Sequence, residues 1–103
     1  MAREQLQTLS EPMYYILLAL TRECCGIDIM KKVDEISNHR ISVGPGTLYA
    51  LLDKFVKMGL ICETKVEGRK RSYIITESGK DALEKECSRL LAMANEGREI
   101  LDK

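Results

Sequence analysis

The chain has 103 residues with sixteen Lys/Arg and sixteen Asp/Glu, so it is neutral overall and long enough for one domain with a modest core. Trp is absent and aromatic residues make up only 5%, which leaves Leu, Ile, Val and Met to build that core. No apolar run approaches the roughly 20 residues of a membrane-spanning helix, and no signal peptide is evident, so we expect a soluble, cytoplasmic protein.

Two helices are predicted in the first third of the chain. Ser10 is a candidate N-cap, Pro12 suits a first helical turn, and apolar residues then recur at helical spacing at Met13, Ile16, Leu17 and Leu20. Gly26 is expected to open a second helix, which should end at Ser37 and Asn38 because these residues compete for backbone hydrogen bonds. The predicted buried stripe of this second helix is Ile29, Val33 and Ile36.

A third helix and a β-hairpin are predicted between Ile41 and Thr76. The helix begins at Gly44-Pro45-Gly46, should end at Gly59, and matches the i, i+3, i+4, i+7 template at Leu48, Leu51, Leu52 and Phe55. Residues 60–66 alternate like a half-buried strand, residues 67–70 form a turn, and residues 73–75 return as a second strand. These features predict a winged helix, a mainly α fold with a small β-hairpin.

The charge distribution separates the middle of the chain from its two ends. Residues 38–76 hold seven Lys/Arg and three Asp/Glu, a net charge of +4, whereas residues 1–37 and 77–103 each carry −2. A local basic face can bind phosphate even on a neutral protein. Thr47 and Ala50 at the start of the third helix can meet base edges, and the wing carries cations that suit the DNA backbone or a minor groove: Arg69, Lys70 and Arg71.

Three further DNA-binding candidates each keep two interpretations. The Tyr49 hydroxyl can reach a phosphate, or the ring can pack at the edge of the core beside Leu52. Ser42 can contact phosphate or cap the third helix, and Lys54 either steers phosphate or is simply solvated. The predicted DNA-binding set is Ser42, Thr47, Tyr49, Ala50, Lys54, Arg69, Lys70 and Arg71.

The last helix, which Thr76 should cap, carries a heptad-like apolar seam. A single helix of about 25 residues cannot bury such a stripe on so small a core, so we expect it to pair with the same helix of a second chain. Folding back within the chain is the alternative. The chain is thus divided into a DNA-binding domain, residues 1–76, and a dimerisation helix, residues 77–103, with the seam residues Leu83, Cys87, Leu90, Ala94 and Leu101.

Catalytic and metal-binding patterns are missing from the sequence. It contains no P-loop, GxGxxG, GxSxG, HExxH or CxxC motif, and His39 is its one histidine. We therefore predict no enzyme activity, no metal and no cofactor. Cys24 and Cys25 are interpreted as buried thiols in a reducing cytosol, and a thiol or small-molecule sensor is one alternative function. A winged-helix module that binds an acidic protein partner is the other.

Several short motifs together resemble the PadR family of bacterial transcriptional regulators. They are GPGTLYA at residues 44–50, GLI at 59–61, GRKRSY at 68–73 and TESG at 76–79, and the match extends from about Ser10 over nearly the whole chain. The length resembles the compact branch of the family with one C-terminal helix. The resemblance implies a winged helix-turn-helix repressor that dimerises through its last helix, often with help from the first, and that a small molecule can release from DNA.

The sequence departs from the family pattern around Ile27, where an aromatic residue is frequent, and around Tyr73, where two aromatic residues are common. It also lacks the C-terminal Trp on which some relatives stack flat drugs. Whether an effector binds therefore stays open. The sequence predicts a regulator that binds double-stranded DNA, as a homodimer on a palindromic operator.

Overall fold

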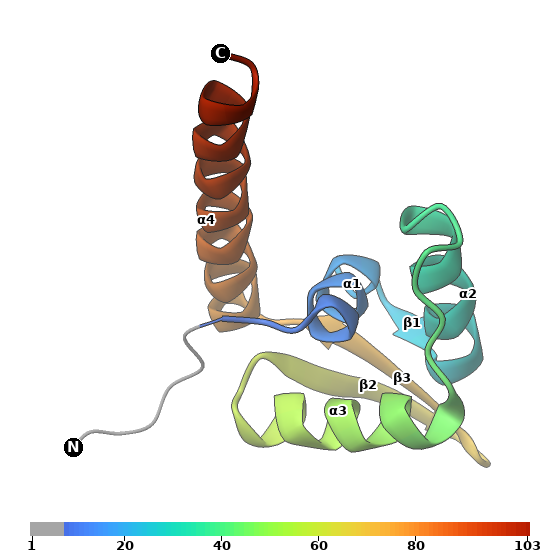
Figure 1. Cartoon of the computed structure of the whole chain (residues 1–103). Coiled ribbons are helices and arrows are strands. Elements are labelled where there is room, and N and C mark those ends of the chain that lie inside the picture. The colour runs from blue at the N-terminus through green and yellow to red at the C-terminus, as the bar shows by residue number, and fades with distance from the viewer. Residues whose placement is uncertain (1–7) are drawn as a thin grey trace.

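The computed structural model describes residues 8–103, with the element order α1, β1, α2, α3, β2, β3 and α4 (Figure 1). Helix α1 spans Glu11–Ala19, and the Ser10 hydroxyl accepts a hydrogen bond from the backbone N–H of Met13 at 3.4 Å. This bond confirms Ser10 as the N-cap. The predicted inner face of α1 is buried in the core at Met13, Ile16, Leu17 and Leu20.

Helix α2 spans Gly26–Ile36 and ends where the sequence predicted, with Ser37 as its C-cap. Ile29 and Val33 are fully buried, but Ile36 is 44% exposed, so its place in the predicted stripe was wrong. Ser37 is only 2% exposed and lies on the core side instead. A helix places residues 36 and 37 on either side of the line through Ile29 and Val33, so spacing alone could not choose between them.

Helix α3 spans Pro45–Lys57 and follows Gly44, whose φ of −82° is an ordinary value. The left-handed backbone is used at the other end, where Gly59 has φ +76° and turns the chain toward the sheet. The predicted inner face is confirmed: Leu51 is half-buried, and three residues are fully buried, namely Leu48, Leu52 and Phe55.

The predicted hairpin belongs to a three-stranded antiparallel sheet of order β1-β3-β2. Strand β2 spans Ile61–Glu67 and strand β3 spans Lys70–Ile75. Strand β1 is only Cys24–Cys25, paired with two residues of β3. Two residues carry no alternation, so nothing in the sequence could indicate β1 before its partner strand was known.

The half-buried alternation predicted for residues 60–66 is wrong for most of its length. Leu60 and Ile61 are buried, but residues 62–70 are all exposed, and Val66 is 56% exposed. The register also shifts between Glu63 and Lys65, where β2 has one more residue than β3. Strand β2 therefore leaves the core after Ile61, whereas β3 stays in contact with it as far as Tyr73, and beyond that pair the hairpin continues as an exposed wing.

Helix α4 spans Glu77–Leu101, the predicted length of 25 residues. The Thr76 hydroxyl accepts a hydrogen bond from the N–H of Gly79 at 3.1 Å and donates one to the carbonyl of Gly59 at 2.6 Å. This side chain thus caps α4 and joins it to the end of α3. A side chain at position 79 would overlap the carbonyl oxygen of Leu60, so Gly79 allows α4 to start close to the sheet.

The first turns of α4 pack on the domain, and the rest of the helix projects away from it (Figure 1). Leu83 is 8% exposed and belongs to the core, whereas Leu90 and Leu101 are 39% and 70% exposed. From Leu90 onward the seam does not fold back onto its own chain, which excludes that alternative for the outer part of the helix. Within residues 8–103 no helix is long and apolar enough to cross a membrane.

Glu86 joins α4 to the segment that precedes α1. Its carboxylate is 4% exposed, accepts a hydrogen bond from the Leu9 N–H at 3.1 Å, and receives two from the Arg89 guanidinium at 2.6 and 2.9 Å. The bonds from Arg89 lower the pKa of Glu86 below its ordinary value, although burial acts in the opposite direction.

Replacing Glu86 by Ala is expected to reduce the free energy of unfolding by about 1–3 kcal/mol, because the Leu9 N–H loses its acceptor and Arg89 its counter-ion. Because folding lowers this pKa, the stabilisation is present above the ordinary glutamate pKa and is lost as pH falls through the lowered value. Urea unfolding at neutral and acidic pH measures both effects. The exposed residue Glu84 on the same helix is the control, and an equal loss in Glu84→Ala would contradict the assignment.

Candidate nucleic-acid interface

The tip of the β2–β3 hairpin lies at the same end of the molecule as the first turn of α3 (Figure 1). Helix α3 runs beside this hairpin, and residues 37–44 connect it to α2. Helices α2 and α3 therefore form a helix-turn-helix, and the hairpin forms its wing. The fold places one helix with an open face beside a cationic tip.

The open face of α3 follows from its buried face. With Leu48 and Leu52 fully buried, Thr47 and Ala50 lie exposed one turn apart, and Lys54 is exposed one turn further along. Short side chains in the first turns allow the helix backbone to come close to base edges. The structure thus brings Thr47, Ala50 and Lys54 onto one accessible surface.

Ser42 is exposed in the turn before α3. The N-cap of α3 is Gly44, and no side chain of the turn makes a capping hydrogen bond. The interpretation of Ser42 as a helix cap is therefore wrong, and its contact with phosphate stays a prediction.

Tyr49 lies over Gly26, the first residue of α2, and is 43% exposed. A Cβ atom at position 26 would overlap the Tyr49 hydroxyl oxygen and lie 2.9 Å from Cζ, so the ring needs a glycine beneath it. From the sequence, Gly26 is expected only to open a helix. Its real partner is 23 positions away, and nothing local in the sequence indicates that contact.

The wing turns at Gly68, which has φ +64°, and presents three exposed cations. Arg71 Nη1 lies 3.5 Å from Glu63 Oε2 across the hairpin, whereas Arg69 and Lys70 form no ion pair within residues 8–103. A cavity of about 340 Å³ lies between the wing and the starts of α2 and α3. Its lining residues are Cys25, Gly26, Ile27, Tyr49, Arg69, Lys70 and Arg71. The structure therefore unites the wing with the start of α3.

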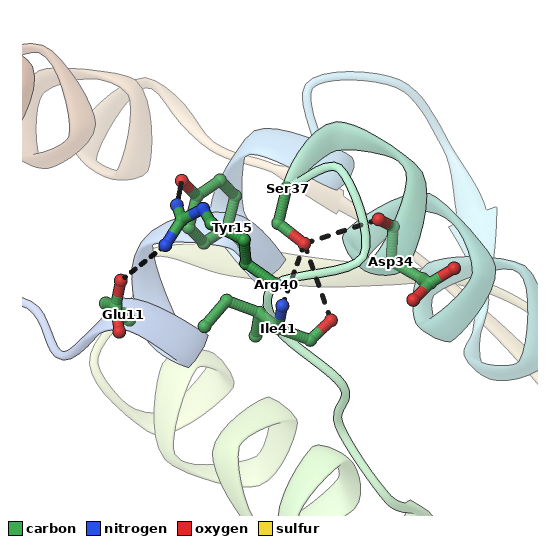
Figure 2. Close-up of polar contacts among 6 residues, drawn as sticks. All are labelled: Glu11, Tyr15, Asp34, Ser37, Arg40 and Ile41. Carbon is green, nitrogen blue, oxygen red and sulfur yellow. Dashed lines mark hydrogen bonds and ion pairs between the residues drawn. The ribbon is translucent and has the colours of Figure 1, made fainter.

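The turn after α2 is held by contacts that the sequence did not reveal (Figure 2). The Ser37 hydroxyl accepts a hydrogen bond from the Ile41 N–H at 3.0 Å and donates to the carbonyl of Asp34 at 3.3 Å. Asn38 and His39 adopt left-handed φ values of 55° and 66°. The His39 Nδ1 atom lies 2.7 Å from the Asp34 carboxylate.

Arg40 connects this turn to α1 (Figure 2). Its guanidinium donates a hydrogen bond to the Tyr15 hydroxyl at 2.8 Å, lies 3.4 Å from the Glu11 carboxylate, and stands 5.9 Å from the centre of the Tyr15 ring. These contacts are exposed, so they orient the turn more than they stabilise the fold. The direction in which the chain enters α3 is thus set from both α1 and α2.

The predicted dimerisation residues fall into two groups. Leu83 packs in the core of its own chain, whereas Cys87 is exposed beside Tyr14 of α1, where the thiol together with burial raises the pKa of Tyr14 to about 12. The remaining predicted residues are exposed at Leu90, Ala94 and Leu101. Other large apolar side chains are exposed beside them, at Leu91, Met93 and Ile100.

All four cysteines are free thiols. Cys24 and Cys25 are buried in β1, and burial raises the pKa of Cys24, which disfavours the reactive thiolate. Cys62 and Cys87 are exposed. In the part of the chain that the structure describes, no group of three or more His, Cys, Asp or Glu side chains is placed to hold a metal ion.

These features define a winged helix-turn-helix protein with a long C-terminal helix. The sequence model of the transcriptional regulator PadR-like family matches residues 16–85, from α1 into α4. The chain belongs to this family, whose members are transcriptional regulators and not enzymes. The prediction of family and fold from the sequence is thereby confirmed.

Solved structures of regulators have the same fold. RosR from H. salinarum is 27% identical with a TM-score of 0.70, and the match covers 82% of this chain and 76% of RosR. A PadR-like transcription factor from Bacteroides fragilis is 28% identical with a TM-score of 0.64, covering 88% and 86% of the two chains. A PadR family regulator from Eggerthella lenta has a TM-score of 0.70 at 20% identity, with 87% and 77% coverage, which supports the fold alone.

One curated relative is an uncharacterised 37.1 kDa protein of a transposon from Streptomyces fradiae. It is 32% identical over 62 residues, which are 60% of this chain. The match spans only 17% of that protein, so the relative is much longer than the shared segment.

Replacing Ser37 by Ala is expected to lower the free energy of unfolding by about 1–3 kcal/mol, because the half-buried Ile41 N–H loses the acceptor that the buried Ser37 hydroxyl provides. The matched control is Ser42→Ala, which removes an exposed hydroxyl from the same turn and should change stability by less than about 0.5 kcal/mol. Thermal or urea unfolding of both variants gives the comparison. Equal stability of the two would show that the Ser37 bond does not hold the turn.

Proposed function

We propose that this protein is a sequence-specific DNA-binding repressor that acts as a homodimer on a palindromic operator. The observation that carries the proposal is that the wing lies at the same end of the molecule as the first turn of α3 (Figure 1), with Arg69 and Lys70 near Tyr49 and without an ion pair in residues 8–103. A helix with short polar side chains fits the major groove, and long cations beside it suit phosphates.

Each candidate residue has a proposed role in this complex. Thr47 and Ala50 face the bases, where the Thr47 hydroxyl can exchange hydrogen bonds and both methyl groups can meet a thymine methyl. The backbone of the DNA is contacted from the flanks of α3 and from the wing. The proposed phosphate-binding residues are Ser42, Tyr49, Lys54, Arg69, Lys70 and Arg71.

The proposed dimer forms through α4 and leaves the winged helix of residues 1–76 free for DNA. Leu90, Ala94 and Leu101 are exposed on a helix that projects from the domain, and burying apolar side chains of this kind drives association. Cys87 lies next to α1, where the exposed surface of α4 meets the domain. Leu83, one turn earlier, packs in the core and holds this end of α4 against the domain. A two-fold axis between the helices would place the two α3 helices on half-sites about 34–36 Å apart.

A small-molecule effector is proposed to act through the same dimer. An effector could bind more tightly to a form of the dimer in which the distance between the two α3 helices does not match the half-sites. Such an effector would lower the affinity of the dimer for the operator. Because the protein acts on chromosomal DNA, its proposed location is the cytoplasm. Double-stranded DNA, a second copy of the chain and this effector are the proposed partners.

The wing prediction concerns salt dependence. The double variant Arg69→Ala, Lys70→Ala should bind every DNA sequence more weakly, and the slope of log K against log salt should flatten by about 0.9 for each phosphate that the variant no longer neutralises. Footprinting on the promoter region of its own gene supplies the operator, and fluorescence anisotropy across a salt series measures the slope. An unchanged slope would remove the wing from the interface, and no protected palindrome for the wild-type protein would refute the proposed function.

The dimer prediction uses charge on the exposed seam. Leu90→Asp should convert the dimer to monomers in sedimentation, because it would bury a carboxylate without a partner at the helix pair. Ser88→Asp adds the same charge to an exposed position on another face of α4 and should leave the dimer intact. A dimer that persists in Leu90→Asp would place the interface elsewhere.

A further inference from the structure

The cavity of about 340 Å³ between α2, α3 and the wing has more positive than negative side chains in its lining. Its lining includes Arg69, Lys70 and Arg71, and no carboxylate belongs to it. Two acids bond to residues of this lining: Glu63 pairs with Arg71, and the Asp28 carboxylate accepts a hydrogen bond from the Cys25 thiol at 3.4 Å, which leaves Arg69 and Lys70 as the cations without an ion pair in residues 8–103. The cavity therefore favours an anion.

Several donors at this cavity have no protein partner. Within residues 8–103, Arg69 and Lys70 have no ion pair and the Tyr49 hydroxyl makes no hydrogen bond. Tyr49 comes from α3, and the two cations come from the wing, so three free donors from two elements meet at one place. The positive end of α2 lies at the same cavity, because Gly26 and Ile27 form part of its wall.

We propose that this cavity holds one phosphate group of the DNA backbone, shared by the Tyr49 hydroxyl and the wing residues Arg69 and Lys70. The inference rests on the proposed function and makes it more specific. A phosphate offers several acceptor oxygens, which match hydroxyl, guanidinium and ammonium donors together. In this arrangement the wing binds the backbone of the DNA strand that borders the groove occupied by α3. The wing does not need to enter a neighbouring minor groove.

Gly26 is the positioning residue of this site. A Cβ there would overlap the Tyr49 hydroxyl oxygen and lie 2.9 Å from Cζ, so the ring would have to move from its place in the wall of the cavity. The requirement is local, because a Cβ at Gly44 or Gly46 near the start of α3 would meet nothing within 4 Å. Gly26 thus leaves room for the Tyr49 hydroxyl at the wall of the cavity.

A double-mutant cycle tests the shared phosphate. Tyr49→Phe and Lys70→Ala should each weaken operator binding about tenfold, as expected for a hydrogen bond to a charged group. Because both groups hold one phosphate, the double variant should lose far less than the product of about 100-fold. The control pairs Tyr49→Phe with Lys54→Ala, since Lys54 is exposed on α3 but does not line the cavity, and these two losses should multiply.

DNA with single methylphosphonate substitutions locates the phosphate itself. One position in each half-site should weaken binding of the wild-type protein and have little further effect on the Tyr49→Phe, Lys70→Ala protein. Multiplying losses with no such position would overturn the cavity proposal while leaving the DNA-binding function in place. A wild-type protein that binds no operator would instead refute the function, so the two failures can be distinguished.

The Gly26 assignment is tested by rescue. Gly26→Ala should weaken operator binding about tenfold or more when Tyr49 is present, and by less than about threefold in a Tyr49→Ala background. Thermal unfolding of each variant separates this effect from loss of the fold. Operator binding of Gly26→Ala at the wild-type level, or an equal loss in both backgrounds, would refute the role of Gly26.

Discussion

The burial of one face of α3 is the constraint on which the interface depends. Leu48, Leu52 and Phe55 have no exposed surface, and each such side chain contributes about 1.5–3 kcal/mol relative to an exposed one. Rotating α3 about its axis would sacrifice much of that free energy at once. The direction in which Thr47 and Ala50 point is therefore determined by packing on the other side of the helix.

Rotation alone does not place a helix, and two contacts set how α3 crosses α2. At the first turn, Tyr49 lies over Gly26, which lets the two helices approach closely. Before α3, Ser37 holds the Ile41 N–H and Arg40 contacts α1, so the chain enters α3 in one direction. The apolar stripe thus sets the rotation of α3, and the contacts of Gly26, Ser37 and Arg40 set the direction in which it crosses α2.

Features that recur over a long stretch of sequence were predictable, and features that depend on a distant partner were not. The stripe of α3, the stop at Gly59 and the 25 residues of α4 follow from local spacing and backbone preference. Strand β1 and the contact between Gly26 and Tyr49 depend on segments far away in the chain. The exposure of Val66 was missed because alternation indicates a strand but does not say whether a core lies beside it.

Helix α4 shows the same difference between local and distant features. The spacing of its apolar residues predicted a seam, but it did not indicate at which residue the helix leaves the core. Within residues 8–103, five of the eleven exposed large apolar side chains lie between Leu90 and Leu101, beyond the point at which Leu83 and Glu86 join the domain. That root is rigid, because Thr76 caps the helix, Gly79 fits against Leu60 and Glu86 binds the segment before α1. In the proposed dimer, the seam would join two chains whose α3 helices are each held at a set angle to α4. The distance between half-sites would then depend on the packing at the root of α4 as much as on the seam itself.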